Sequence, residues 1–259
     1  MSATIRLDHV EGVSFLTIDR PPLNTVSPRT LGEMLTALDQ LAHRDETRCV
    51  VMRGTGTRAF CAGANLDDKP HDADDASTAF RDAGRAVVEC IERFPKPTIA
   101  AIRGWCIGGG VALAQACDVR LAAENAKFRT GDAYIGIVPS WGMSLVRLCH
   151  YIGRNRALDM LILGEDIGAR EAHALGLVSR VLADDGFEEA VAAIAARVAT
   201  GAPLVFRSIK EAILAQYAEG PGAARHLETY WSEITQGSHD YNEGIAAFKE
   251  KRKPRFEGR

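Results

Sequence analysis

The stretch that decides the fold is Thr98-Ile-Ala-Ala-Ile-Arg-Gly-Trp-Cys-Ile-Gly-Gly-Gly-Val-Ala-Leu113. A short apolar run stops at Gly104, and three consecutive glycines then precede a second apolar run. The first run predicts a buried strand. Glycines before an apolar stretch are typical of a helix that begins with bare backbone N–H groups, and they also suit close packing of a helix on a sheet. Both interpretations stay open from the residues alone.

A similar order occurs earlier in the chain. Cys49-Val-Val-Met52 predicts a buried strand that is closed by Gly54-Thr-Gly56, and Arg58-Ala-Phe-Cys-Ala-Gly-Ala-Asn-Leu66 follows it. Neither glycine segment is a phosphate motif, because no Lys-Ser/Thr pair follows the glycines and the GxGxxG register is missing. Short buried strands between helical stretches indicate an α/β fold with covered sheets.

The expected elements on either side follow from apolar spacing and from breaks at proline and glycine. The segment of about 3–20 predicts a strand, and Ser27-Pro28 predicts the N-cap and first position of a helix that runs to about His43. A second helix is expected near Phe80–Phe94. The stretch Leu66–Asp75 is expected to be a mobile loop, since its start is polar and carries Pro70.

The chain changes character after about residue 185, where only helical patterns remain. The expected helices there are Glu188–Thr200, one opened by a capping box at Ser208-Ile-Lys-Glu211, and stretches at about 222–236 and 241–250. The predicted division is therefore a core over residues 1–195 and a helical C-terminal region over residues 196–259, without a linker that would make them independent.

Composition excludes several classes of protein. The 259 residues carry a formal net charge of −3, which gives no general case for nucleic-acid binding. The six cysteines have no CxxC spacing and are typical of small core residues in a reducing compartment, so a cytoplasmic protein is expected. The sequence contains no apolar run of about 18 residues, so no membrane span is predicted. The seven histidines are scattered and predict no metal site.

Five short segments along the chain are weak signals individually, and their common order and spacing carry the information. They are Phe60–Leu66, Ile107–Gly110 with Cys117-Asp118, Gly136–Pro139, Ala169–Val178 and Glu243–Pro254. In that order and spacing the chain resembles the enoyl-CoA hydratase/isomerase (crotonase) superfamily over nearly its whole length. The resemblance implies a spiral of repeated β-β-α units and a C-terminal helical region that builds homotrimers, often paired into hexamers. It also implies an acyl-CoA enzyme, an isomerase or lyase of fatty acid metabolism.

The resemblance supplies a thioester site. The thioester carbonyl of such substrates lies between two backbone N–H groups, which fall here at Ala64 and Gly109. A thioester enolate carries negative charge on this oxygen, so fixed donors stabilise mainly the transition state, and one donor is worth about 10²–10³ in rate. No prosthetic group is implied; coenzyme A enters as part of the substrate.

The reaction depends on the carboxylates. Family hydratases use two glutamates, which fall here at Ala112, where proton transfer is impossible, and at Asp132, which is one methylene shorter. A third position, used by some isomerases and by a dehalogenase subgroup, falls at Ser140. One carboxylate can remove a proton from one carbon and return it two carbons away, so double-bond isomerisation with Asp132 as base is favoured, with hydration close behind. The other interpretation of Asp132 is a carboxylate that caps the turn after Gly131.

The remaining site residues follow from the resemblance or from their neighbours. Tyr134 and Trp141 flank the Gly136–Pro139 turn and are expected to line the acyl pocket with Ser140 and Ala112, although core packing suits both aromatic side chains. Asp118, His150, His173, Cys61 and Cys106 are expected to be structural. Coenzyme A is expected to contact Asn24, Val26, Ala62, Ala64, Asn65, Leu66 and Gly109, and also Phe248 and Lys251, often across a subunit boundary. The alternatives are a CoA-ester-binding oligomer without catalysis and an RNA-binding homologue, and the net charge opposes the latter.

Overall fold

The computed structural model describes residues 3–67, 75–141 and 144–259 as two sheets with helices around them. The larger sheet consists, in spatial order, of β1 (Ile5–Val10), β2 (Val13–Ile18), β3 (Cys49–Gly54), β5 (Thr98–Ile102), β7 (Val119–Ala123) and β10 (Arg180–Leu182). The smaller sheet consists of β4 (Ala59–Cys61), β6 (Trp105–Ile107), β8 (Lys127–Arg129) and β9 (Ile167–Gly168).

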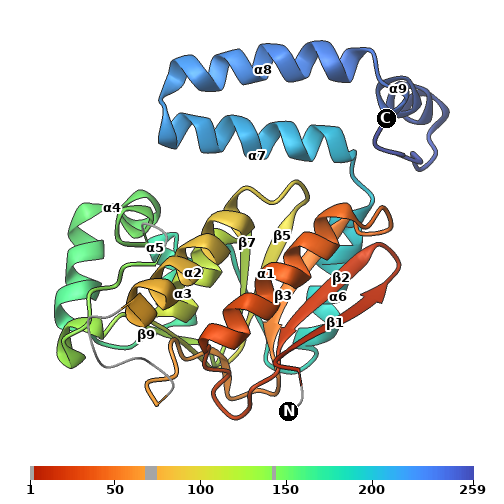
Figure 1. Ribbon diagram of the computed structural model, residues 1–259. Coiled ribbons are helices and arrows are strands. Elements are labelled where there is room, and N and C mark those ends of the chain that lie inside the picture. Colours follow the sequence, from red (N-terminus) through yellow and green to blue (C-terminus); the bar gives the residue numbers. More distant parts are fainter. Residues whose placement is uncertain (1–2, 68–74, 142–143) are drawn as a thin grey trace.

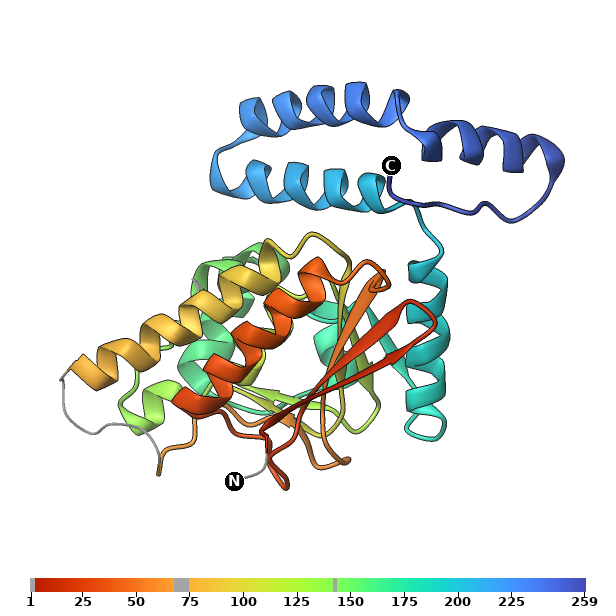
Figure 2. The same cartoon turned by 45° about the vertical axis from the view of Figure 1, so that its right-hand side comes forward.

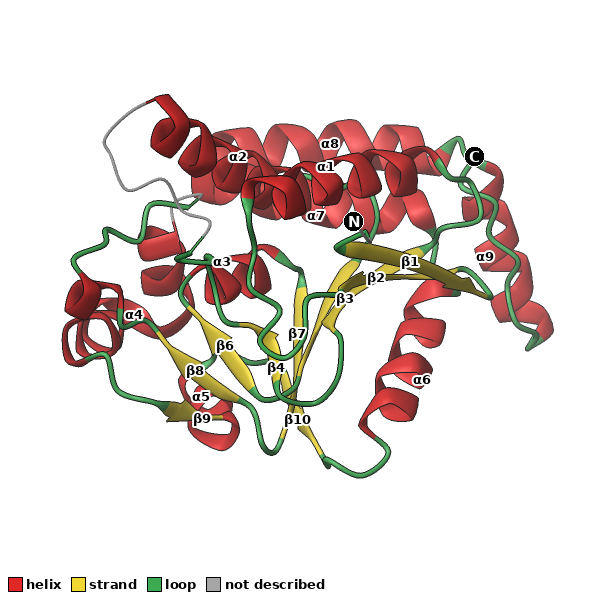
Figure 3. Ribbon diagram, turned by 60° about the horizontal axis from the view of Figure 1, so that its bottom comes forward, coloured by secondary structure: helices red, strands yellow, loops and turns green. Residues whose placement is uncertain are grey.

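The chain alternates between the two sheets. β3, β5 and β7 pair in parallel in the larger sheet, and the strand that follows each of them, β4, β6 and β8, pairs in parallel in the smaller one. Helices α2 (Asp75–Glu92) and α3 (Gly109–Ala116) return the chain to the larger sheet after β4 and β6. Figure 3 shows both sheets and these connections. This arrangement is the expected spiral of β-β-α units, so the predicted fold class is confirmed.

Two apolar cores lie on the two faces of the larger sheet. One face packs against α1 (Pro28–His43), α2 and α3, and the other packs against α6 (Phe187–Ala199). Figure 2 shows α1 and α2 running side by side over one face, with α6 on the opposite side. Successive residues of the central strands serve opposite cores, for example Met52 and Val51, because side chains alternate along a strand.

The remaining helices follow the same order along the chain. They are the 3₁₀ helix η1 (Asp132–Ile135), α4 (Ser144–Leu163), α5 (Ala169–Leu175), α7 (Pro203–Ala218), α8 (Pro221–Gln236) and α9 (His239–Glu250). Helices α7 and α8 form a hairpin above the α/β body (Figure 1). Among the described residues no single helix has the length and apolarity to cross a bilayer, although α6 and α7 together, bent by 100°, reach that length and composition.

Lys210 attaches the hairpin to the body. Its Nζ lies 2.7 Å from Asp118 Oδ2 and 3.0 Å from the carbonyl oxygen of Lys96. The same Asp118 oxygen accepts hydrogen bonds from the N–H and the hydroxyl of Thr98, at 2.7 and 2.9 Å. Asp118 is therefore a structural residue, as expected.

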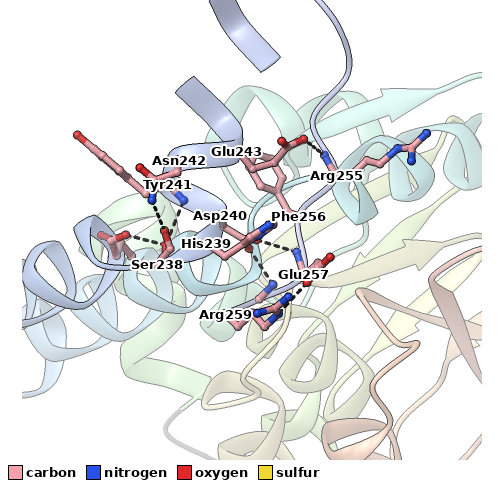
Figure 4. Close-up of polar contacts among 12 residues, drawn as sticks. Ser238, His239, Asp240, Tyr241, Asn242, Glu243, Arg255, Phe256, Glu257 and Arg259 are labelled. Atoms are coloured by element: carbon pink, nitrogen blue, oxygen red, sulfur yellow. Dashed lines mark hydrogen bonds and ion pairs between the residues drawn. The ribbon is translucent and has the colours of Figure 1, made fainter. Parts of the chain in front are cut away.

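The C-terminal tail folds back after α9. Asp240 is 4 % exposed and accepts hydrogen bonds from the N–H groups of Glu257 and Gly258, at 2.7 and 2.8 Å (Figure 4). Its own N–H donates to the carbonyl oxygen of Arg259. The tail also reaches the body, because the Arg48 guanidinium donates to the carbonyl oxygen of Phe256 at 2.9 Å.

Two local predictions were wrong. The single strand expected over about 3–20 is a hairpin of β1 and β2, because Glu11 and Gly12 both adopt positive φ and reverse the chain in two residues. The capping box at Ser208 does not open a helix. Helix α7 begins at Pro203, which suits the first turn, and Ser208 lies inside it with its hydroxyl donating to the Val205 carbonyl.

The other local predictions have mixed outcomes. Ser27 caps α1 as expected by accepting from the Thr30 N–H at 3.3 Å. The predicted division after residue 195 falls inside α6, which packs on the sheet and ends at Ala199, and the division itself stays a prediction. Most of the expected loop, residues 68–74, lies outside the described residues.

Candidate active site

A cavity of about 810 Å³ lies where the two glycine segments meet. Its walls come from the ends of β4 and β6, from the start of α3, from η1 with the loop after it, and from α2. Most lining side chains are small or apolar, and Asp132 is the only carboxylate among the described lining residues. A cavity of this kind with few polar groups is typical of a small-molecule site.

The backbone of Ala64 is oriented by its pairing with Val26. The Val26 N–H donates to the Gly63 carbonyl at 2.9 Å, and the Asn65 N–H donates to the Val26 carbonyl at 2.8 Å. In a parallel bridge the residue between those two partners turns its own N–H to the opposite side. The Ala64 N–H therefore points away from Val26, and among the described residues it donates no hydrogen bond.

The Gly109 N–H is the first of α3. The opening N–H groups of a helix have no intrahelical partner, and the helix dipole favours negative charge there. The segment that carries Ala64 is close by, since a Cβ atom built on Gly63 would lie 3.4 Å from the Gly109 nitrogen. Two backbone donors thus lie at one end of the cavity. The glycines serve packing as well, because a Cβ at Gly110 would collide with the Cys61 carbonyl.

Asp132 lies beside the same turn. It is the first residue of η1, and a Cβ on Gly108 would lie 3.3 and 3.6 Å from its two carboxylate oxygens. The Gly108 N–H in turn donates to the Arg129 carbonyl at 3.0 Å, three residues before Asp132. The carboxylate therefore lies directly beside the start of α3. This arrangement combines donors for an oxyanion with a group that can accept a proton.

The other predicted pocket residues also line the cavity. Ala112 on α3 is 2 % exposed, and Ser140 lies in the loop that follows η1. Tyr134 lines the cavity while its hydroxyl donates to the Ile162 carbonyl at 2.8 Å. Trp141 lines the cavity and is also buried, so it serves both of the roles that were considered for it.

Comparison with known proteins identifies the family. The family model for enoyl-CoA hydratase/isomerase matches residues 8–259. The chain belongs to the enoyl-CoA hydratase/isomerase family. It is 38 % identical over 249 residues to a probable enoyl-CoA hydratase of Bacillus subtilis, with 95 % of each chain covered. It is 32 % identical over 259 residues to the 1,2-epoxyphenylacetyl-CoA isomerase of Escherichia coli, with 98 % of each covered.

A solved structure of this family agrees in fold. The enoyl-CoA hydratase of Bacillus anthracis superimposes with a TM-score of 0.94 at 33 % identity, covering 99 % of this chain and 100 % of the other. Membership makes the chain an enzyme of acyl-CoA thioesters that needs no prosthetic group. Among the described residues, no group of three His, Cys, Asp or Glu side chains is placed to hold a metal ion.

Only some of the residues expected to contact coenzyme A line the cavity. Ala62, Ala64, Leu66 and Gly109 do so, and Asn65 lies between two of them in the chain. The buried Asn24 side chain instead donates to the carbonyls of Thr55 and Ala59, and both backbone groups of Val26 are used in the bridge to residues 63 and 65.

Phe248 and Lys251 are apart from the cavity of their own chain. They lie at the end of α9, beyond the hairpin of α7 and α8 (Figure 1), and neither lines the cavity. Phe248 is 86 % exposed, and Lys251 adopts a left-handed conformation with φ of 55° at the end of the helix.

Cys61, Cys106, His150 and His173 are structural, as expected. Burial raises the pKa of Cys61 to about 12 and raises the pKa of Cys106 well above its usual value, so neither thiol is a nucleophile at neutral pH. His150 stacks on Tyr217, and His173 Nδ1 lies 2.9 Å from the Val178 carbonyl oxygen.

Sequence reasoning missed the wall that α2 provides. Phe80 and Arg81 of α2 line the cavity. The sequence predicted a helix that begins near Phe80, but spacing within one helix does not tell which partner covers a face. The contact depends on α2 packing beside α3, which is a property of the fold.

Proposed function

We propose that this protein isomerises the double bond of enoyl-CoA thioesters through a thioester enolate. The N–H groups of Ala64 and Gly109 hold the thioester oxygen. Asp132 removes a proton from C2 of a 3-enoyl thioester, the double bond moves to C2–C3, and the same carboxylic acid returns the proton to C4. The atoms balance without a co-reactant, and the negative charge rests on the oxygen between the two donors.

The observation that carries this proposal is the set of groups around the cavity. Asp132 is the only carboxylate among the described lining residues. Ala112 and Ser140, the two other positions where the resemblance implies an acid, line the same cavity. One base suffices for a proton shuttle, whereas addition of water needs a group to hold and activate the water as well. The Escherichia coli relative at 32 % identity is named a 1,2-epoxyphenylacetyl-CoA isomerase, so isomerisation of a CoA thioester occurs among the relatives of this chain.

Hydration is the second candidate. The Bacillus subtilis relative at 38 % identity is named a probable enoyl-CoA hydratase. In this chain one carboxylate would have to position the water, with help from Ser140. The hydroxyl of Tyr134 already donates to Ile162, which leaves it less able to donate to a water molecule.

We also propose that the site is completed by a neighbouring subunit of a trimer. Phe248 is almost fully exposed beyond the helical hairpin, and Lys251 follows it. An exposed phenylalanine and a lysine suit the adenine and the phosphates of coenzyme A. α7, α8 and α9 also expose large apolar side chains that a subunit contact would cover, namely Val205, Ile209, Ile213, Tyr217, Tyr230, Ile234, Tyr241 and Ile245.

The test is a comparison of 3-enoyl-CoA and 2-enoyl-CoA substrates of several chain lengths, with wild-type protein and Asp132→Ala. We expect 3-enoyl-CoA to be converted to 2-enoyl-CoA by the wild type and not by Asp132→Ala. Accumulation of 3-hydroxyacyl-CoA from 2-enoyl-CoA at a higher rate than isomerisation would favour hydration. Tight binding of CoA esters without turnover of either substrate would show a protein that has lost catalysis.

A further inference from the structure

Trp141 connects two helices at the edge of the cavity. Its indole is 8 % exposed and lies between Gly109, at the start of α3, and Gly84, in the middle of α2. A Cβ on Gly109 would lie 2.6 Å from the indole Cζ3, and a Cβ on Gly84 would lie 2.7 Å from its Nε1. Both glycines thus let their backbones touch the ring directly, closer than any side chain would allow.

The two contacts involve different parts of the indole. The six-membered ring lies against Gly109, where Cζ3, Cε3 and Cη2 are the nearest atoms. The nitrogen side of the ring lies against Gly84. Phe80 contacts the same indole edge-on, with the ring centroids 5.4 Å apart at 71°. Phe80 and Gly84, one helical turn apart on α2, therefore both contact the indole.

Gly84 does not itself line the cavity, whereas Gly109 and Trp141 do. A change at Gly84 can reach the bound thioester only through what it touches. Because protein interiors are close-packed, an added methyl group at Gly84 must move either the indole or α2. Movement of the indole displaces the Gly109 backbone, which has no side chain to absorb the shift.

We infer that Trp141 is a positioning residue, which fixes the Gly109 N–H relative to the thioester oxygen and transmits the position of α2 to it through Gly84. The inference rests on the proposed role of Gly109 as an oxyanion donor. Positioning of this kind matters because a displacement on the order of 1 Å can cost about 10²-fold in rate.

The direct readout is the absorbance of bound 4-(dimethylamino)cinnamoyl-CoA. Hydrogen bonds to the thioester oxygen draw charge from the amino end of this conjugated probe and move its absorbance to longer wavelength. The shift therefore reports the oxyanion donors separately from turnover. We compare wild type, Gly84→Ala, Trp141→Phe and the double variant, with kcat and KM for the isomerisation measured beside the spectra.

A matched control is Gly32→Ala on α1. Gly32 is also in a helix, but a Cβ there meets no atom within 4 Å. This variant makes the same chemical change without contact to the indole. We expect it to keep the full red shift and the wild-type kcat.

We expect Gly84→Ala to lose most of the red shift and to lower kcat about tenfold or more, with a smaller change in KM. In the Trp141→Phe background, where the smaller ring leaves room for the methyl group, Gly84→Ala should cost much less. Equal effects of Gly84→Ala in both backgrounds, or a full red shift in Gly84→Ala, would overturn the inference. A wild-type complex without any red shift would instead contradict the proposed oxyanion site itself.

Discussion

Gly108→Ala is predicted to damage catalysis more than stability. Gly108 has φ of 51° and ψ of −112°, a conformation that costs a residue with a side chain about 1–3 kcal/mol. The new methyl group would also lie 3.3 Å from Asp132 Oδ1, closer than an ordinary van der Waals contact. The carboxylate must move by a few tenths of an ångström at least, away from the turn that carries Gly109. We expect about 2 kcal/mol less free energy of unfolding and a kcat lowered about 10- to 100-fold.

The assay combines urea unfolding with steady-state isomerisation of 3-enoyl-CoA. The matched control is Gly186→Ala, since Gly186 also has positive φ, at 72°, and its nearest neighbour is an atom of Glu189 at 4.0 Å. This control should lose about 1–2 kcal/mol of stability and keep its kcat. If Gly108→Ala retained the wild-type kcat at a temperature where it is fully folded, the proposed coupling of Asp132 to the turn would be refuted.

Three further predictions concern the rest of the molecule. Lys210→Met should lower the free energy of unfolding by about 1.5–3 kcal/mol, because it removes a charged donor from Asp118. A coupling energy below about 0.5 kcal/mol in a double-mutant cycle with Asp118→Asn would contradict a stabilising interaction between the two side chains. Burial alone raises the pKa of Glu33, but hydrogen bonds from the N–H and hydroxyl of Thr4 outweigh it and lower the pKa to about 2. Its stabilising contribution is therefore present above pH 4.5 and lost as the pH falls towards 2. Unfolding titrations should show Glu33→Gln less stable than wild type at pH 7 and equal to it near pH 2. A constant difference in the free energy of unfolding across this range would contradict the lowered pKa. Asp240→Ala should free the C-terminal tail, seen as faster proteolysis after α9, and equal protection of the variant would show that other contacts hold the tail.

The start of α1 and the start of α3 were predictable because the residues that determine each of them are neighbours in the sequence. Ser27 caps α1 within four residues of chain, and the start of α3 at Gly109 follows from three glycines before an apolar run. The resemblance placed Ala64, Gly109, Ala112 and Asp132 at one site, and the structure gathers all four around one cavity.

The predictions that were wrong or missing depend on competition between local signals, or on contacts between residues far apart in the sequence. The hairpin at Glu11-Gly12 was missed because β1 and β2 read as one apolar alternation until the backbone turns. Ser208 carries a capping sequence, yet Pro203 starts the helix five residues earlier. The contact of Trp141 with Gly84 joins a loop to α2, so no spacing within either segment contains it.

The role of Asp132 as the proton-shuttling base is tested by the kcat of Asp132→Asn for 3-enoyl-CoA, measured beside its binding of 4-(dimethylamino)cinnamoyl-CoA. Asparagine keeps the size of the side chain and removes its ability to accept and return a proton. We expect a kcat lowered by about 10²–10⁴, with the red shift of the bound probe preserved because Ala64 and Gly109 are unchanged. A wild-type kcat in Asp132→Asn would show that Asp132 is not the base.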